Sequence, residues 1–408
     1  MYKKLNTRKL SANYIFTGKS VLKNGIIEIA PNGEITKVID TKGDLQESAS
    51  LEFFPGVLTP GFVNAHCHLE LSHMKGVIDN KTVKGLPGFV HEIIRKRNFP
   101  EDLEEQIRKA DREMQTEGIV AVGDISNTDD SFSVKTKSPI YYQTFVETFA
   151  VSNQAAEENF ETAKQNLSIL QSLHLPGNIV PHAVYSVPDT LAEEIAQFHA
   201  KNSGIISIHN QETESEDLML QTKKGILAET LGDLGFQLSD FNFDTESATV
   251  HNLKNQEAIK HILLIHNTFS KKDDIRTMEK YSQKVFPVFC PLSNLYIEKR
   301  LPDLPSFFTS EKLSCCFGTD SYASNHCLSI LEELKAVVTS YPTIPFEKLV
   351  QAATLNGARA LQIEEQFGSI EVGKTPGINL ITDFDGKKMT LSPRSKVKVL
   401  VPGKRTRN

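Results

Sequence analysis

The stretch GFVNAHCHLELSH, residues 61–73, holds three of the 12 histidines in a chain of 408 residues. It begins as an apolar run, which is typical of a buried strand. Residues two apart in a strand share a face, so His66 and His68 should point the same way and Cys67 the opposite way. Two imidazoles that converge at a strand end suit a divalent metal ion. Alone, the stretch is compatible with a metal site, and the alternative is that one histidine packs in the core while the other is solvated.

Seven further apolar runs follow, and they alternate with charged, helix-like segments. The eight runs are 61–66, 119–125, 140–149, 178–186, 205–210, 262–269, 285–291 and 313–321. Such alternation favours a parallel sheet, and eight strands predict a (β/α)₈ TIM barrel over residues 59–365. An open doubly wound sheet is the alternative. We place the extra length in insertions at 69–100 and 211–261, the second of which could form a lid.

Both ends of the chain have a β character that differs from the middle. Residues 1–58 contain short β-rich runs, with Asn24-Gly25 and Asn32-Gly33 as hairpin signals. Residues 366–408 return to β-like sequence with Gly-rich turns. We therefore expect a small β-sandwich domain built from 1–58 and 366–408.

Composition excludes several classes of protein. The chain is 39% hydrophobic and has a net charge of −6, without the dense basic block that nucleic-acid binding requires. No apolar run reaches the ~18 residues of a membrane helix. The five cysteines include no C-x-x-C pair, which favours a reducing compartment. These features predict a cytoplasmic protein without a nucleic-acid or membrane partner.

Residues that can bind a metal ion stand at the ends of several later apolar runs. His182, His209, His266 and Asp320 come at the ends of the fourth, fifth, sixth and eighth. Any one of them alone would more often be structural, but parallel strand ends meet at one face of a barrel. A histidine-rich rim with one carboxylate suits a catalytic metal and its water. Glu212 is placed to face the same cavity as a general acid or base, or else belongs to the solvated run after it.

Several motifs occur in order along the chain: PGFVNAHCHLE, PHAVYSVP, IHNQE, LIHNTF, CPLSN, GTDSYASN and FGSIEVGKTPGINLI. Together they resemble the amidohydrolase superfamily, in its branch of aminohydrolases and chlorohydrolases. That branch includes aminodeoxyfutalosine, adenosine-derivative, guanine and cytosine deaminases. One departure is Pro376-Gly377, where the family usually has Ala-Asp.

The resemblance implies a role for each candidate residue. Members with two metals carry a modified lysine after the fourth strand, where this chain has His182. One divalent ion is therefore expected, with zinc favoured and iron the alternative. His182 would contact substrate, and Glu70 lies close enough in sequence to line the same pocket. The implied metal ligands are His66, His68, His209 and Asp320, and the implied catalytic residues are Glu212, His266 and Asp320.

The resemblance also implies the reaction. We expect a metal-dependent hydrolase that deaminates an aminopurine-type or other N-heterocyclic small molecule through a metal-activated water. The form HLELS followed by GLPGFVHEIIRKR makes aminodeoxyfutalosine a candidate substrate. The alternatives are a chlorohydrolase, a cyclic amide hydrolase and a non-catalytic metal-binding relative. Pairing of barrels in the family suggests a homodimer.

Overall fold

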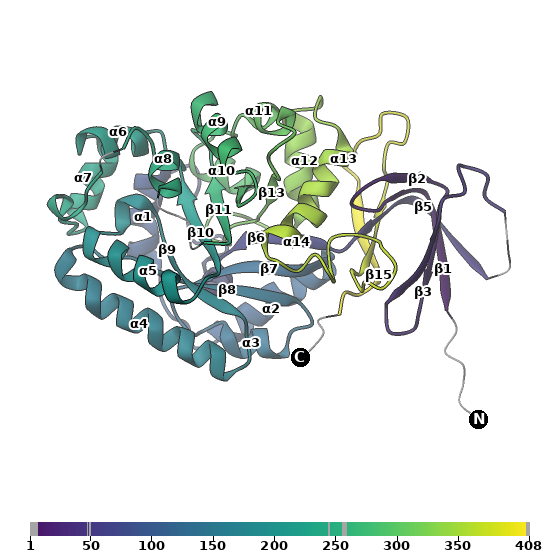
Figure 1. Cartoon of the computed structure of the whole chain (residues 1–408), viewed down its shortest axis with the longest axis horizontal. Coiled ribbons are helices and arrows are strands. Elements are labelled where there is room, and N and C mark those ends of the chain that lie inside the picture. Colours follow the sequence, from purple (N-terminus) through teal and green to yellow (C-terminus); the bar gives the residue numbers. More distant parts are fainter. Residues whose placement is uncertain (1–6, 47, 49, 244, 255–258, 405–408) are drawn as a thin grey trace.

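Eight parallel strands form the centre of the molecule (Figure 1). The computed structural model of the chain describes residues 7–46, 48, 50–243, 245–254 and 259–404. The strands make two four-stranded sheets, in the orders β6-β7-β8-β9 and β10-β11-β12-β13. Their bounds are β6 (Phe62–Cys67), β7 (Ile119–Ser126), β8 (Tyr141–Thr148), β9 (Gly177–Pro181), β10 (Ile205–Asn210), β11 (His261–His266), β12 (Val285–Phe289) and β13 (Cys316–Phe317).

The two sheets are joined by backbone hydrogen bonds at their carboxyl ends. The His209 N–H donates to the carbonyl of His182 at 2.9 Å, beside a parallel bridge between Ala183 and His209. A second parallel bridge pairs Cys67 with Asp320. The strand ends that carry the predicted site residues are therefore held together.

All eight predicted strands are present, but two are shorter than expected. The run 178–186 ends as a strand at Pro181, and Val184–Ser186 forms a 3₁₀ turn. Proline lacks the N–H that a continuing strand would need, so it suits a strand end. The run 313–321 keeps only the two residues of β13 as a strand. The chain leaves the strand after Phe317, and Asp320 forms a parallel bridge with Cys67 at the end of β6.

Helices surround the strands and form the outer layer (Figure 1). Strand residues alternate between the two sides: Val63 and Phe145 pack in an inner cluster, whereas Phe62 and Cys67 pack outward. Among the described residues, no helix has the length and apolarity that crossing a membrane requires. The helices are α1 (Gly85–Lys96), α2 (Leu103–Thr116), α3 (Phe132–Lys137), α4 (Asn153–Ser172), α5 (Asp189–Lys201), α6 (Ser215–Thr222), α7 (Ile226–Asp233), α8 (Ala248–Leu253), α9 (Lys272–Lys280), α10 (Pro291–Ile297), α11 (Leu304–Thr309), α12 (Ile330–Ser340), α13 (Phe346–Gln351) and α14 (Gly357–Ala360).

The two predicted insertions pack on each other. Met74 and Phe89 of the first share one apolar cluster with Leu227 and Phe241 of the second. Tyr185, directly after β9, belongs to the same cluster. The insertions therefore form one body beside the carboxyl end of the strands. Among the residues that the structure describes, neither insertion contributes to the histidine cluster described below, and His251 is half-buried in α8.

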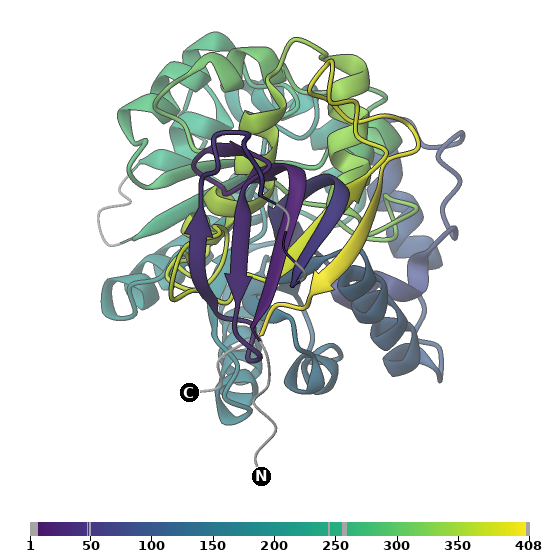
Figure 2. The same ribbon diagram turned by 90° about the vertical axis from the view of Figure 1, so that its right-hand side faces the viewer.

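The two terminal segments share one sheet on a single side of the molecule (Figures 1 and 2). Its order is β15-β14-β5-β1-β3-β4, with β2 also paired to β1. The long β5 pairs with β1 on one edge and β14 on the other, and this merges both segments into a single sheet. The bounds are β1 (Arg8–Phe16), β2 (Val21–Lys23), β3 (Ile26–Ile29), β4 (Ile35–Ile39), β5 (Leu51–Pro60), β14 (Ile378–Thr382) and β15 (Lys396–Val401).

Two expectations about this region need correction. The described residues of the terminal segments contain one seven-stranded sheet, not the two facing sheets of a sandwich. Asn32-Gly33 does lie in the turn between the antiparallel β3 and β4. Asn24-Gly25 instead links β2 to β3, which both pair with β1. The hairpin of β1 and β2 turns at 17–20, where the Thr17 N–H donates to the Ser20 carbonyl at 2.9 Å.

Candidate active site

The histidine pair at the end of β6 is set by a β-bulge. Asn64 pairs with Val122 and Cys67 with Asp124, so β6 has one residue more than β7 over this interval. Such a bulge re-aims side chains at a strand end. The strand stops at Cys67, and His68 already lies outside it. The prediction that Cys67 faces away from the pair is confirmed, since Cys67 packs in the outer apolar cluster.

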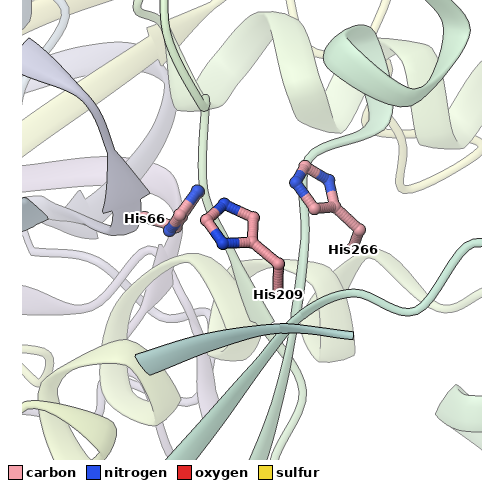
Figure 3. Close-up of side chains that lie close together, drawn as sticks. All are labelled: His66, His209 and His266. Atoms are coloured by element: carbon pink, nitrogen blue, oxygen red, sulfur yellow. The ribbon is translucent and has the colours of Figure 1, made fainter. Parts of the chain in front are cut away.

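The predicted ligands lie close together. His66 Nε2 and His68 Nε2 are 3.2 Å apart. Asp320 Oδ1 is 3.6 Å from His68 Nε2 and 3.9 Å from His66 Nε2. His66, His209 and His266 converge from β6, β10 and the end of β11, and each offers a donor atom within 4.8 Å of the others (Figure 3). Strand ends far apart in sequence therefore supply one cluster.

Three spacings between donor atoms, 3.2, 3.6 and 3.9 Å, are close to those around a tetrahedral ion. Ligands about 2.0–2.3 Å from zinc lie roughly 3.3–3.8 Å apart along the edges of a tetrahedron. Burial lowers the pKa of His66 well below its usual range, and nearby His68 and His209 lower it further. Burial also lowers the pKa of His68 to about 3. Both imidazoles are therefore neutral at pH 7, as a metal ligand must be.

His209 is oriented by the strand beside it. Its Nδ1 lies 2.9 Å from the carbonyl oxygen of His182, so Nδ1 carries the proton and donates it. The lone pair is then on Nε2. A backbone carbonyl that fixes the tautomer of a histidine is a common support for metal ligation. Burial, followed by the effect of His182, lowers the pKa of His209, which keeps the ring neutral.

Asp320 is held as a carboxylate. Burial opposes its ionisation, but His68 and His266, together with two hydroxyl donors, bring its pKa below the usual range. Ser293 and Ser324 donate to Oδ2 at 2.6 and 2.7 Å. Asp320 also has a positive φ of 57°, a left-handed conformation that Asp tolerates better than most residues. Its Oδ1 accepts from the Ser321 N–H at 2.7 Å and faces the histidine pair.

Glu212 and His266 stand beside the cluster. Glu212 Oε1 lies 3.5 Å from His266 Nε2. Burial raises the pKa of Glu212 well above its usual range, and Asp320 raises it further, which favours the protonated carboxyl group. Burial lowers the pKa of His266 to about 3. The pair thus places a carboxyl group that favours its proton beside a neutral imidazole.

Comparison with protein families matches residues 57–404 to the amidohydrolase family. The chain belongs to the amidohydrolase family. Its catalytic class follows from the relatives together with this match. This amidohydrolase is a hydrolase of carbon–nitrogen bonds other than peptide bonds, of the deaminase class.

Curated relatives cover most of the sequence. An adenosine deaminase from Helicobacter pylori is 27% identical over 336 residues, which are 81% of this amidohydrolase and 80% of the relative. An aminodeoxyfutalosine deaminase from Nitratiruptor is 26% identical over 343 residues, 80% of this chain and 78% of that one. Such identities place the protein among these enzymes without fixing its substrate.

Solved structures show the same fold. Aminofutalosine deaminase from Helicobacter pylori, in complex with methylthio-coformycin, has a TM-score of 0.77 at 24% identity and covers 92% of both chains. The zinc-containing atrazine chlorohydrolase from Arthrobacter aurescens has a TM-score of 0.69 at 16% identity, covering 97% of this chain and 95% of that one. At these identities the likeness concerns the fold alone.

Glu70 has a full set of protein donors in this amidohydrolase. One of its oxygens accepts from the N–H groups of Asn127 and Thr128, at 2.9 and 3.0 Å, and from the Thr128 hydroxyl. The other accepts from Arg97 at 3.2 Å. In return, the Leu69 N–H donates to Asp124 of β7 at 2.8 Å. Hydrogen bonds in both directions therefore hold the turn after His68 against the end of β7, and Glu70 accepts several of them.

Two further residues complete the rim on its β8–β9 side. His182 Nδ1 is 2.9 Å from the Ser186 hydroxyl, and its ring centroid is 4.7 Å from that of His209. Glu147 of β8 has a donor atom within 4.8 Å of both histidines. Glu147 is not among the site residues that the sequence predicts. The signal was present, because an acid two residues after the apolar Phe145 shares its inward face.

Proposed function

We propose that this amidohydrolase deaminates an adenine nucleoside, with one zinc ion held by His66, His68, His209 and Asp320. The observation that carries the proposal is the convergence of His66, His68, His209 and Asp320 at the strand ends, with Glu212 Oε1 3.5 Å from His266 Nε2 beside them. The curated relatives support the substrate class, because they include adenosine, aminodeoxyfutalosine and 5'-deoxyadenosine deaminases.

The proposal includes the architecture that surrounds the site. We propose that the eight parallel strands close into a (β/α)₈ barrel, since hydrogen bonds join β9 to β10 and the end of β13 to β6. The terminal sheet, from 1–58 and 366–408, then forms a small β domain beside it. The active site of such a barrel lies at the carboxyl ends of its strands.

Zinc suits the donor set better than the other common divalent ions. Three imidazoles and one carboxylate are nitrogen-rich, whereas magnesium and calcium prefer oxygen donors. Iron accepts similar ligands and is the alternative. When bound, the ion supplies a Lewis acid that makes water a stronger acid and a nucleophile at neutral pH.

The side chains provide the remaining steps. Asp320 accepts the proton of the attacking water, and His266 holds that water by a hydrogen bond. Glu212 donates its proton to the ring nitrogen next to the amino-bearing carbon, which makes that carbon more electrophilic. Addition of water then gives a tetrahedral intermediate. Proton delivery to the amino group releases ammonia and restores the ring as a carbonyl product.

Ammonia release by the zinc-loaded protein tests the proposal. The panel is adenosine, 5'-deoxyadenosine, aminodeoxyfutalosine, guanine, cytosine and a chlorotriazine. We expect turnover of at least one adenine nucleoside and its loss in Glu212→Gln. Chloride release without ammonia release would assign a chlorohydrolase. If the panel yields neither ammonia nor chloride and a cyclic amide is opened instead, the protein would be a cyclic amide hydrolase.

A further inference from the structure

Glu147 is a buried acid with one oxygen left unsatisfied. Its side chain is 3% exposed, at the carboxyl end of β8. Oε2 accepts a hydrogen bond from Asn127 Nδ2 at 3.0 Å. Oε1 has no hydrogen-bond partner among the described residues. A buried acceptor without a donor costs free energy, so its presence at this position calls for an explanation.

Two other carboxylates in this region have a hydrogen-bond donor for each oxygen. Glu70 has four protein donors, as described above. Glu333 accepts from the Leu292 N–H at 2.8 Å and from Asn325 Nδ2 at 2.9 Å, one donor on each oxygen. Both carboxylates fasten loops. Glu147 Oε1 fastens nothing, although it lies at the rim of the site.

Support of His209 does not account for this oxygen. The distance from Glu147 Oε1 to His209 Nδ1 is 3.6 Å, which is too long for a good hydrogen bond. The proton on Nδ1 is already donated to the His182 carbonyl at 2.9 Å. A cation shared between Glu147, His182 and His209 would require removal of that proton. The free oxygen is therefore best matched by a donor that arrives with the substrate.

The position of Glu147 indicates which part of the substrate it meets. Glu212 and His266 stand on the β10–β11 side of His209, whereas Glu147 and His182 stand on the β8–β9 side. Phe149, two residues after Glu147, is 42% exposed, and its ring centroid is 5.9 Å from that of His182. The flank around Glu147 thus offers one carboxyl oxygen without a donor and one accessible aromatic ring.

We infer that Glu147 binds the ribose hydroxyls of the substrate and selects ribonucleosides; this inference rests on the proposed function. An adenine nucleoside has few hydrogen-bond donors. Its amino group must face the reacting water, Glu212 and Asp320. The donors that remain for the β8–β9 flank are the sugar hydroxyls, and a carboxylate accepts from a vicinal diol with both lone-pair directions.

A cycle of two proteins and three substrates tests the inference. We measure kcat/KM of zinc-loaded wild type and Glu147→Gln with adenosine, 2'-deoxyadenosine and 3'-deoxyadenosine. Glu147→Gln should lower kcat/KM for adenosine about 10- to 100-fold, mainly through KM, because the amide replaces one acceptor oxygen with an N–H donor. It should change the value less than about threefold for whichever deoxy substrate lacks the bonded hydroxyl. Gln143→Ala, at the other end of the same strand, is the control.

Each outcome is decisive. An equal loss on all three substrates, with wild type active, would overturn the role in sugar binding and leave the proposed function in place. A fall in zinc per protein in Glu147→Gln, measured by plasma emission spectrometry, would reassign Glu147 to the metal site. No turnover of any adenine nucleoside by wild type would remove the proposed function, and this inference with it.

Discussion

The backbone of His66 is hydrogen-bonded directly to the backbone of Asp320. The carbonyl oxygen of His66 accepts from the N–H groups of Thr319 and Asp320, each at 3.0 Å. The residue before them, Gly318, has no side chain, and a Cβ there would lie 2.8 Å from the Cβ and the carbonyl oxygen of His66. Two proposed ligands of one ion are thus held in register by the main chain, and glycine permits the contact.

Gly318→Ala should therefore damage both stability and the metal site. Overpacking against backbone costs about 1–3 kcal/mol of unfolding free energy, and the shift of His66 should weaken zinc binding. Chemical denaturation and zinc titration measure the two effects. The matched control is Gly232→Ala, where a Cβ meets nothing within 4 Å; this helical change should be neutral or stabilise by up to ~1 kcal/mol. Equal behaviour of the two variants would contradict the close contact.

Removal of one imidazole should remove the metal. We expect His209→Ala to fall from about one zinc per chain to a small fraction of that, and to lose turnover, because one of the four proposed protein ligands is removed. Elemental analysis after dialysis against a chelator gives the ratio. His251→Ala, a half-buried histidine of α8, should keep its zinc. Full zinc retention in His209→Ala would refute the proposed ligand set.

The acid at the site should affect rate and pH profile but not metal content. Glu212→Gln keeps the shape and loses the proton, so kcat should fall about 10²- to 10⁴-fold with zinc retained. Because the pKa of Glu212 is raised by burial, the wild type should keep its acid through neutral pH and lose activity as pH rises through that pKa. The variant should lack this alkaline limb. An unchanged profile would assign the proton transfer to another group.

The buried ion pair of Lys135 and Asp124 should support the stability of the fold only while both partners are present. Lys135 Nζ lies 2.5 Å from Asp124 Oδ2, and both side chains are fully buried. Lys135→Met leaves the Asp124 charge without its partner and should cost about 3–5 kcal/mol of unfolding free energy. In the double variant Lys135→Met with Asp124→Asn, the amide still accepts from Leu69 without a charge, so most of the loss should return. Additive losses in denaturant melts would argue against the pairing.

Glu216 should make stability depend on pH. Its oxygens accept from the N–H groups of Gln211 and Glu212, each at 3.0 Å, and burial raises its pKa from 4.5 to about 8. The folded state therefore binds a proton more tightly than the unfolded state. The stability from this group is complete below pH 4.5 and declines as pH rises to about 8, by at most ~5 kcal/mol at ~1.4 kcal/mol per unit.

The difference in melting temperature between wild type and Glu216→Gln, measured from pH 5 to 8, isolates this effect. We expect the advantage of the wild type to shrink as pH rises. Glu193→Gln, an exposed acid of α5, should show no such trend. A difference that is constant with pH would mean that Glu216 has the same charge in both states.

The strands and the polar residues at their ends could be predicted because both depend on short-range patterns, whereas the proposed ligands were chosen among those residues by the family resemblance. Apolar runs reveal buried strands, and polar residues at their ends reveal the functional face. The bulge at the end of β6 could not be predicted, since it depends on the register with β7. Glu147 was missed because its importance depends on a buried oxygen without a hydrogen-bond donor, which only the three-dimensional structure reveals. The single terminal sheet depends on pairing between β5 and β14, which are far apart in sequence.

That pairing has a consequence for the order of assembly in the cell. Strand β5 leaves the ribosome early, but its neighbour β14 is among the last elements to be made. Until then, one long edge of β5 has open N–H and C=O groups, and such edges recruit other strands. Pairing with β14 covers this edge, so the terminal sheet can be complete only after the segment that contains β14 has been made.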